Sequence, residues 1–86
     1  MNEAKVFGAF LRQIRIEKGA TLGEASQACG LNYDNYGRYE LATRHPPSPK
    51  MVKRFIEGLN LNEIEAAGLK LLAYKYHEAI LIQKWR

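Results

Sequence analysis

The stretch Thr21-Leu22-Gly23-Glu24-Ala25-Ser26-Gln27-Ala28-Cys29-Gly30-Leu31-Asn32, with the residues from Tyr33 to Glu40 that follow it, decides the fold of this chain. Thr21 and Glu24 have the spacing of a capping box, in which the Thr hydroxyl and the Glu carboxylate bind free amides at the start of a helix. The sequence therefore predicts a helix that begins at Leu22. It ends two turns later at Cys29-Gly30, because glycine adopts a positive φ at little cost.

A second short helix is expected after this turn. Asn32 is a favourable N-cap, and the helix runs from Tyr33 to about Glu40. Tyr36 and Tyr39 are three residues apart and are predicted to face inward, which leaves the other side chains outward. Two short helices joined by a glycine-containing turn form the helix-turn-helix pattern. The second helix of this pattern fits the major groove of DNA, whose width of about 12 Å admits one helix.

Apolar residues at spacings of three and four predict a helix before this pattern. It is expected from about Glu3 to Lys18, because a glycine after a basic residue, as in Lys18-Gly19, is a stop signal. Its apolar face holds Val6, Phe7, Phe10, Leu11 and Ile14.

Two further helical segments are predicted after the loop from Leu41 to Pro47. Ser48-Pro49 begins the first, with Ser as N-cap and Pro at the first helical position. Asn60 is expected to cap the next segment, with Glu63 at its third position. The residues from Leu61 to about Lys84 contain no proline and are expected to form one long helix, or two that break near Gly68.

Length and composition place the chain among single-domain globular proteins, and the helical periodicity of its apolar residues predicts an all-α fold. Of its 86 residues, 47% are hydrophobic and 26% are charged, which argues against disorder. No segment alternates like a half-buried strand, and no apolar run approaches the roughly 18 to 20 residues that span a membrane. The net charge of +4 suits a nucleic-acid binder without identifying one. We expect a cytoplasmic protein.

Enzymatic activity is not expected. The sequence contains no phosphate-binding glycine loop, no nucleophile with a matched base and no paired carboxylates around a cleft. Cys29 and His77 are too few and too far apart in sequence to suggest a zinc site. We therefore predict no metal and no cofactor.

The residues from Phe7 to Leu61 resemble the phage-repressor/Cro type of helix-turn-helix, also called the Xre family. The resemblance rests on Leu11 to Gly19, on Thr21 to Asn32, on the proline-containing loop, on Phe55 to Leu61, and on Tyr36, Arg38, Tyr39 and Glu40. It implies a repressor-like bundle of four to five helices that binds double-stranded operator DNA, usually as a dimer. It also implies an ion pair between Arg15 and Glu40.

The resemblance assigns base-edge contacts to positions on the second helix of the motif and a base or phosphate contact to Arg38. The residue chemistry adds Thr21 and Arg44 as phosphate contacts. Asn32 is expected to be a cap first, and Asp34 also suits the first turn of a helix, where the dipole favours negative charge. The predicted DNA-binding set is Thr21, Asn32, Tyr33, Asp34, Asn35, Gly37, Arg38 and Arg44.

The chain is expected to divide into a DNA-binding domain, residues 1–62, and a C-terminal helical extension, residues 63–86. The extension is apolar on more than one face, so it should meet a partner, most simply a second copy of the chain. The alternative is that it folds back and fills the core of its own domain. The predicted dimerisation residues are Ile64, Leu71, Leu72, Tyr74 and Leu81.

Three hypotheses for the function follow. The first is a homodimeric transcriptional repressor that binds an inverted repeat, with half-sites about 34 Å apart. The second is an antitoxin that represses its own operon and holds a toxin through its C-terminal helix. The third is a protein-interaction adaptor that does not bind DNA, which Asp34, Leu22 and the modest net charge keep open.

Overall fold

Five helices and no strand make up the part of the chain that the structure describes. The structure is a computed structural model that describes residues 2–43 and 45–84, with side chains described up to residue 79. It confirms the all-α prediction. The helices are α1 (Glu3–Glu17), α2 (Leu22–Ala28), α3 (Tyr33–Glu40), α4 (Pro49–Gly58) and α5 (Glu63–Lys84).

Each helix begins at a polar side chain that accepts hydrogen bonds from the first turn. Asn2, Thr21, Asn32 and Ser48 cap α1 to α4. The cap of α5 is Asn62, whose Oδ1 accepts from the Glu65 amide at 2.8 Å while the Glu65 carboxylate accepts from the Asn62 amide at 3.0 Å. The prediction of a cap at Asn60 was therefore wrong by two residues.

The first four helices end in the same way. The residue after each C-cap adopts a left-handed backbone conformation, with φ of 73° at Gly19, 71° at Gly30, 60° at Ala42 and 53° at Asn60. The next amide then donates back to a carbonyl five residues earlier, as from Ala20 to Arg15 at 3.1 Å and from Thr43 to Arg38 at 3.0 Å. This is the Schellman arrangement, which satisfies carbonyls that a helix end leaves free. Asn60 thus belongs to the end of α4.

One hydrophobic core joins all five helices, and Phe55 of α4 lies near its centre. The Phe55 ring centroid lies 5.2 Å from that of Tyr39, 6.1 Å from that of Tyr36 and 6.3 Å from that of Phe7. Aromatic pairs at such separations contribute about 0.5–1.5 kcal/mol each beyond the area they bury. Tyr36 and Tyr39 of α3 are both buried, as their spacing predicts.

Two glycines allow the helices to approach closely. A Cβ at Gly8 of α1 would collide with the backbone carbonyl of Glu40 at the end of α3. A Cβ at Gly58 of α4 would likewise collide with the carbonyl of Ala28 at the end of α2. The α2–α3 pair is therefore held against the rest of the bundle by direct backbone contact.

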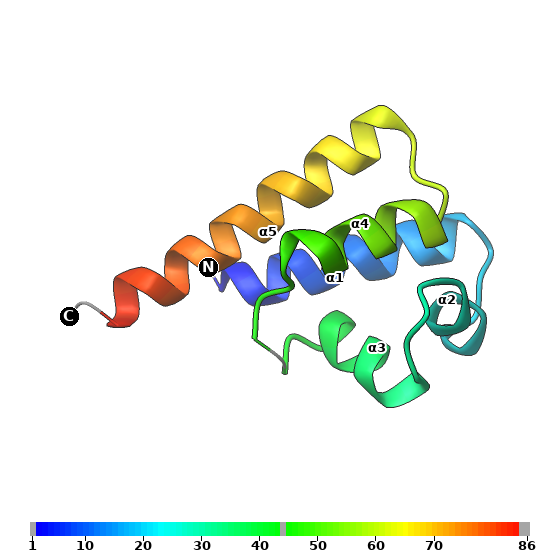
Figure 1. Ribbon diagram of the computed structural model, residues 1–86, viewed down its shortest axis with the longest axis horizontal. Coiled ribbons are helices and arrows are strands. Elements are labelled where there is room, and N and C mark those ends of the chain that lie inside the picture. Colours follow the sequence, from blue (N-terminus) through cyan, green and yellow to red (C-terminus); the bar gives the residue numbers. More distant parts are fainter. Residues whose placement is uncertain (1, 44, 85–86) are drawn as a thin grey trace.

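The long helix α5 is continuous through Gly68 and lies across α1 and α4 (Figure 1). Its residues Leu69, Ala73 and Tyr76 are buried in the same core as Phe7. Figure 1 shows α3 on the opposite side of the bundle from α5, with α1 and α4 between them. The last turns of α5 project beyond the other helices.

Candidate DNA-binding surface

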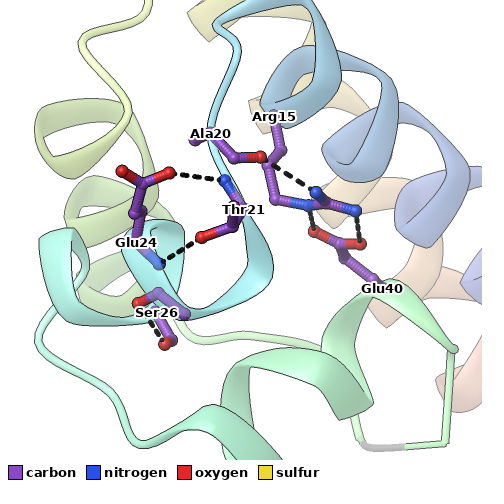
Figure 2. Close-up of polar contacts among 7 residues, drawn as sticks. Arg15, Ala20, Thr21, Glu24, Ser26 and Glu40 are labelled. Carbon is purple, nitrogen blue, oxygen red and sulfur yellow. Dashed lines mark hydrogen bonds and ion pairs between the residues drawn. The ribbon is translucent and has the colours of Figure 1, made fainter.

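The start of α2 is fixed by local hydrogen bonds (Figure 2). The Thr21 hydroxyl accepts from the Glu24 amide at 3.1 Å, and the Glu24 carboxylate accepts from the Thr21 amide at 2.9 Å. The hydrogen bond from the Thr21 amide, followed by that from the Thr21 hydroxyl, lowers the pKa of Glu24. Inside α2, the buried Ser26 hydroxyl donates to the Gly23 carbonyl at 2.9 Å. The polar side chains at the start of α2 thus form hydrogen bonds with backbone amide and carbonyl groups of the same segment.

The turn between α2 and α3 sets the direction in which α3 begins. Gly30 takes its positive φ, and the Leu31 amide donates to the Ser26 carbonyl at 2.9 Å. The Asn32 Oδ1 then accepts from the Asn35 amide at 2.8 Å. Asn32 therefore caps α3, which was expected to be its first role.

The helix α3 has a buried side and an exposed side. Tyr36 and Tyr39 are buried, whereas Tyr33 is 58% exposed and Asp34 and Arg38 are also exposed. Among the other predicted contact positions, Asn35 and Gly37 are half-buried and Thr21 and Asn32 are exposed. Arg44 lies outside the described residues.

An ion pair holds the end of α3 against α1. Arg15 Nε lies 2.8 Å from Glu40 Oε2, and Arg15 Nη2 donates to Glu40 Oε1 at 3.2 Å, so the pair is bidentate (Figure 2). Arg15 Nη1 also donates to the Ala20 carbonyl at 3.0 Å, just before α2. The hydrogen bond to Glu40 is the largest effect on Arg15 and raises its pKa. One guanidinium therefore joins α1, the approach to α2 and the end of α3.

A hollow of about 640 Å³ lies between the exposed side of α3 and the neighbouring face of α1. It brings together residues that are distant in sequence, Arg12 from α1, Leu22 from α2 and Arg38 from α3. Tyr33, Asp34, Gly37 and Leu41 also line it. Within the described part of the chain, Arg12 and Arg38 have no carboxylate partner.

The family model described as "Helix-turn-helix domain" matches residues 6–69, about three quarters of the chain. The chain belongs to this helix-turn-helix family. No curated protein and no solved structure matches it. A helix-turn-helix domain is a DNA-binding domain, so the exposed side of α3 and the hollow beside it form the candidate DNA-binding surface.

The sequence did not point to Arg12 as part of the helix-turn-helix surface. Its only signal is that it lies three residues before Arg15, on a similar side of α1. Spacing along one helix cannot show that α3 lies across from it. Leu41, predicted to begin the loop after α3, is 73% exposed and lines the same hollow.

The Tyr36 hydroxyl is a second feature that the sequence did not reveal. It lies on the buried side of α3 and has no hydrogen-bond partner among the described residues. Burial raises its pKa, and the nearby Glu40 carboxylate raises it further. The hydroxyl therefore stays protonated and neutral. Tyr36 supports α3 from within the core and is not part of the exposed surface.

The predicted dimerisation residues on α5 divide between two environments. Ile64, Leu71 and Tyr74 are exposed, whereas Leu72 is half-buried and packs against the core. The side chain of Leu81 lies outside the described residues.

Three other findings bear on the predicted absences. In the described ranges, no group of three or more His, Cys, Asp or Glu side chains is placed to bind a metal ion. No helix there is long and apolar enough to cross a membrane. Cys29 is buried, and burial raises the pKa of its thiol to about 11, so the thiolate is scarce at neutral pH.

Proposed function

We propose that this helix-turn-helix protein is a sequence-specific transcriptional regulator of the phage-repressor/Cro (Xre) type. It acts as a cytoplasmic repressor that binds an inverted-repeat operator as a homodimer. The observation that carries the proposal is the division of α3 into a buried side and an exposed side. Tyr36, Tyr39 and the Arg15–Glu40 ion pair fix the helix, while Tyr33 and Arg38 are left free for a ligand outside the protomer.

The proposal assigns different tasks to the residues of the surface. Arg38 is the main reader, because a guanidinium donates two hydrogen bonds to the O6 and N7 atoms of guanine. Tyr33 contacts the backbone or a thymine methyl, and Asn35 and Gly37 lie over base edges. Thr21 and Arg44 contact phosphates, which position the domain without reading sequence. Asp34 either accepts from a cytosine amine or stabilises the first turn of α3.

The test begins with selection of bound DNA from a random pool, which gives the preferred site and its symmetry. We expect Arg38→Ala to weaken binding to this site about ten- to a hundredfold, the loss of one bidentate base contact. The helical circular dichroism should not change, because Arg38 is exposed and carries no ion pair in the described part of the chain. Binding is measured by fluorescence anisotropy at several salt concentrations.

The matched control is Lys75→Ala, which removes one exposed positive charge from α5, on the other side of the bundle from α3. It should leave affinity for the selected site nearly unchanged. If Arg38→Ala bound the selected site as tightly as the native chain, α3 would not be the reading helix. If selection enriched no sequence, the protein would not be a sequence-specific regulator.

A further inference from the structure

The helix α5 carries an exposed apolar stripe on the side that faces away from the core. Ile64 is 84% exposed, Leu71 54% and Tyr74 65%, and the exposed Ala67 lies between the first two. With Glu78, these residues form what we call the seam, at alternating spacings of three and four: Ile64, Ala67, Leu71, Tyr74 and Glu78. The spacing is that of the contact positions in a two-stranded coiled coil.

The seam is distinct from the face by which α5 packs in its own protomer. Leu69, Ala73 and Tyr76 point into the core, on the opposite side of the helix. The helix α5 lies on the far side of the bundle from α3, and its seam faces away from the core, so a partner bound there leaves the DNA-binding surface open. Large side chains exposed in a row gain free energy when they are covered.

Charged residues on and beside the seam indicate how the seam of a second copy could cover it. Glu78 occupies a seam position itself, and Lys70 and Lys75 flank the stretch from Leu71 to Tyr74. All three are exposed, and none has an ion-pair partner within the part of the chain that the structure describes. Their order along the helix discriminates between the two directions in which a second copy could pair.

Pairing in the parallel direction would place like charges together. Glu78 would face Glu78 of the second copy, because equivalent seam positions meet in a parallel pair. Lys70 would lie beside Lys75 of the second copy, since the positions that flank the seam pair in this way. The contact between the two Glu78 side chains would lie on the symmetry axis, and the contact between Lys70 and Lys75 would occur twice. Both contacts are repulsive.

We propose that the seam pairs in the antiparallel direction with the seam of a second copy. The inference rests on the homodimer of the proposed function and adds its direction and register. Leu71 packs against Tyr74 of the second copy, and the small Ala67 leaves room for the stem of Glu78. The Glu78 carboxylate then lies beside Lys70 of the second copy, and symmetry forms this ion pair twice. Lys75 lies near Gly68 of the second copy, where it meets no charge.

In this arrangement the apolar residues provide affinity and the charges select direction. Exposed ion pairs contribute little to affinity, but like charges at the same positions disfavour the wrong partner arrangement. The interruption of the apolar stripe by Glu78 is thus part of the recognition.

Charge reversal distinguishes the two directions by the sign of its effect. We expect Lys70→Glu to raise the dimer Kd about five- to thirtyfold, because it faces Glu78 of the second copy. The variant Glu78→Lys should do the same, and the double variant should restore most of the affinity. A parallel pair requires the reverse for Lys70→Glu, which would then attract Lys75 and tighten the dimer. The matched control is Lys75→Glu, which should change the Kd little in the antiparallel pair and tighten a parallel one.

Disulfide trapping tests the register. Full-length Leu71→Cys and Tyr74→Cys chains, one carrying a size tag, are mixed and oxidised. Antiparallel pairing should give chiefly the mixed dimer, because these two positions face each other. Parallel pairing should give the two homodimers, because each position then faces itself. Cys29 does not compete, since it is buried with a raised pKa.

Sedimentation of the charge variants is carried out without DNA, so the inference and the proposed function fail separately. A tighter dimer in Lys70→Glu, or homodimers as the main disulfide product, would overturn the antiparallel pairing and leave DNA recognition untouched. A chain that is monomeric at all concentrations would overturn the pairing together with the homodimer of the proposed function, and the DNA selection would still test sequence recognition by α3. Failure to enrich a DNA site would overturn the regulator and leave the pairing in place.

Discussion

Among the helix ends that the structure describes, the end of α3 places an alanine, Ala42, in a backbone conformation that does not suit it. Its φ of 60° is left-handed, where a Cβ approaches the following carbonyl. Gly19 and Gly30 adopt similar values without a Cβ, and asparagine, as at Asn60, tolerates this region better than most residues. The end of α3 therefore stores a small amount of strain, held by the hydrogen bond from Thr43 to the Arg38 carbonyl.

We expect Ala42→Gly to raise the free energy of unfolding by about 0.5–1 kcal/mol, because relief of the left-handed strain exceeds the added chain entropy of glycine. The measurement is urea denaturation followed by circular dichroism. The matched control is Ala9→Gly at an exposed position inside α1, which should lower stability by about 1 kcal/mol. If both substitutions destabilised the protein alike, Ala42 would not be strained.

Within the element α3, Gly37 lowers the stability of the helix relative to an alanine at the same position. A glycine inside a helix costs about 1 kcal/mol relative to alanine. Gly8 and Gly58 are explained by backbone carbonyls that a Cβ would strike, but a Cβ at Gly37 would meet nothing within 4 Å. Gly37 lines the hollow beside Arg38. We infer that its missing side chain makes room for DNA.

Gly37→Ala should therefore separate stability from binding. We expect the free energy of unfolding to rise by about 0.5–1 kcal/mol while affinity for the selected DNA falls. Denaturation and anisotropy are measured on the same preparation. Gly8→Ala serves as the contrast, since its Cβ collides with the Glu40 carbonyl and should destabilise the fold. An unchanged DNA affinity in Gly37→Ala would mean that the hollow does not receive DNA closely at this point.

The elements that could be predicted from the sequence are those whose ends depend on local chemistry. Thr21 with Glu24, Asn32 and Ser48 fixed three helix starts, because an N-cap requires only a few neighbouring residues. Asn60 and Asn62 could not be distinguished in this way, since asparagine both caps helices and adopts left-handed conformations. The amide of Leu61 decides between them, because it donates to the Ile56 carbonyl and closes α4.

For the whole molecule, α5 is needed to complete the core as well as to present the seam. Deleting residues 65–86 removes Leu69, Ala73 and Tyr76, and would expose Phe7. We expect this truncated chain to be unfolded by circular dichroism, because three buried side chains are lost at once. The control deletes residues 80–86, which leaves those side chains in place, and should remain folded. A folded 1–64 chain would show that the first four helices form a core by themselves.

The face that α5 turns toward the core of its own protomer could not be predicted from its sequence. Both faces are apolar, so the stripe of Leu69, Ala73 and Tyr76 and the seam looked equally suited to a core or to a partner. Only the packing of α5 on α1 and α4 shows which face is used within the protomer. Arg12 could not be predicted for a related reason. It lies near Arg38 only because the fold places α1 beside α3, and the two residues are distant in sequence.

Because one helix joins the protomer core to the proposed dimer contact, the protein's concentration enters its folding equilibrium. A second copy binds the seam only while α5 is helical and docked, so association draws the equilibrium away from the unfolded chain by mass action. At a concentration one hundred times the dimer Kd, such linkage is worth about 2.7 kcal/mol. Dilution would then lower the melting temperature, and chains left after synthesis stops would become easier to degrade as their number falls.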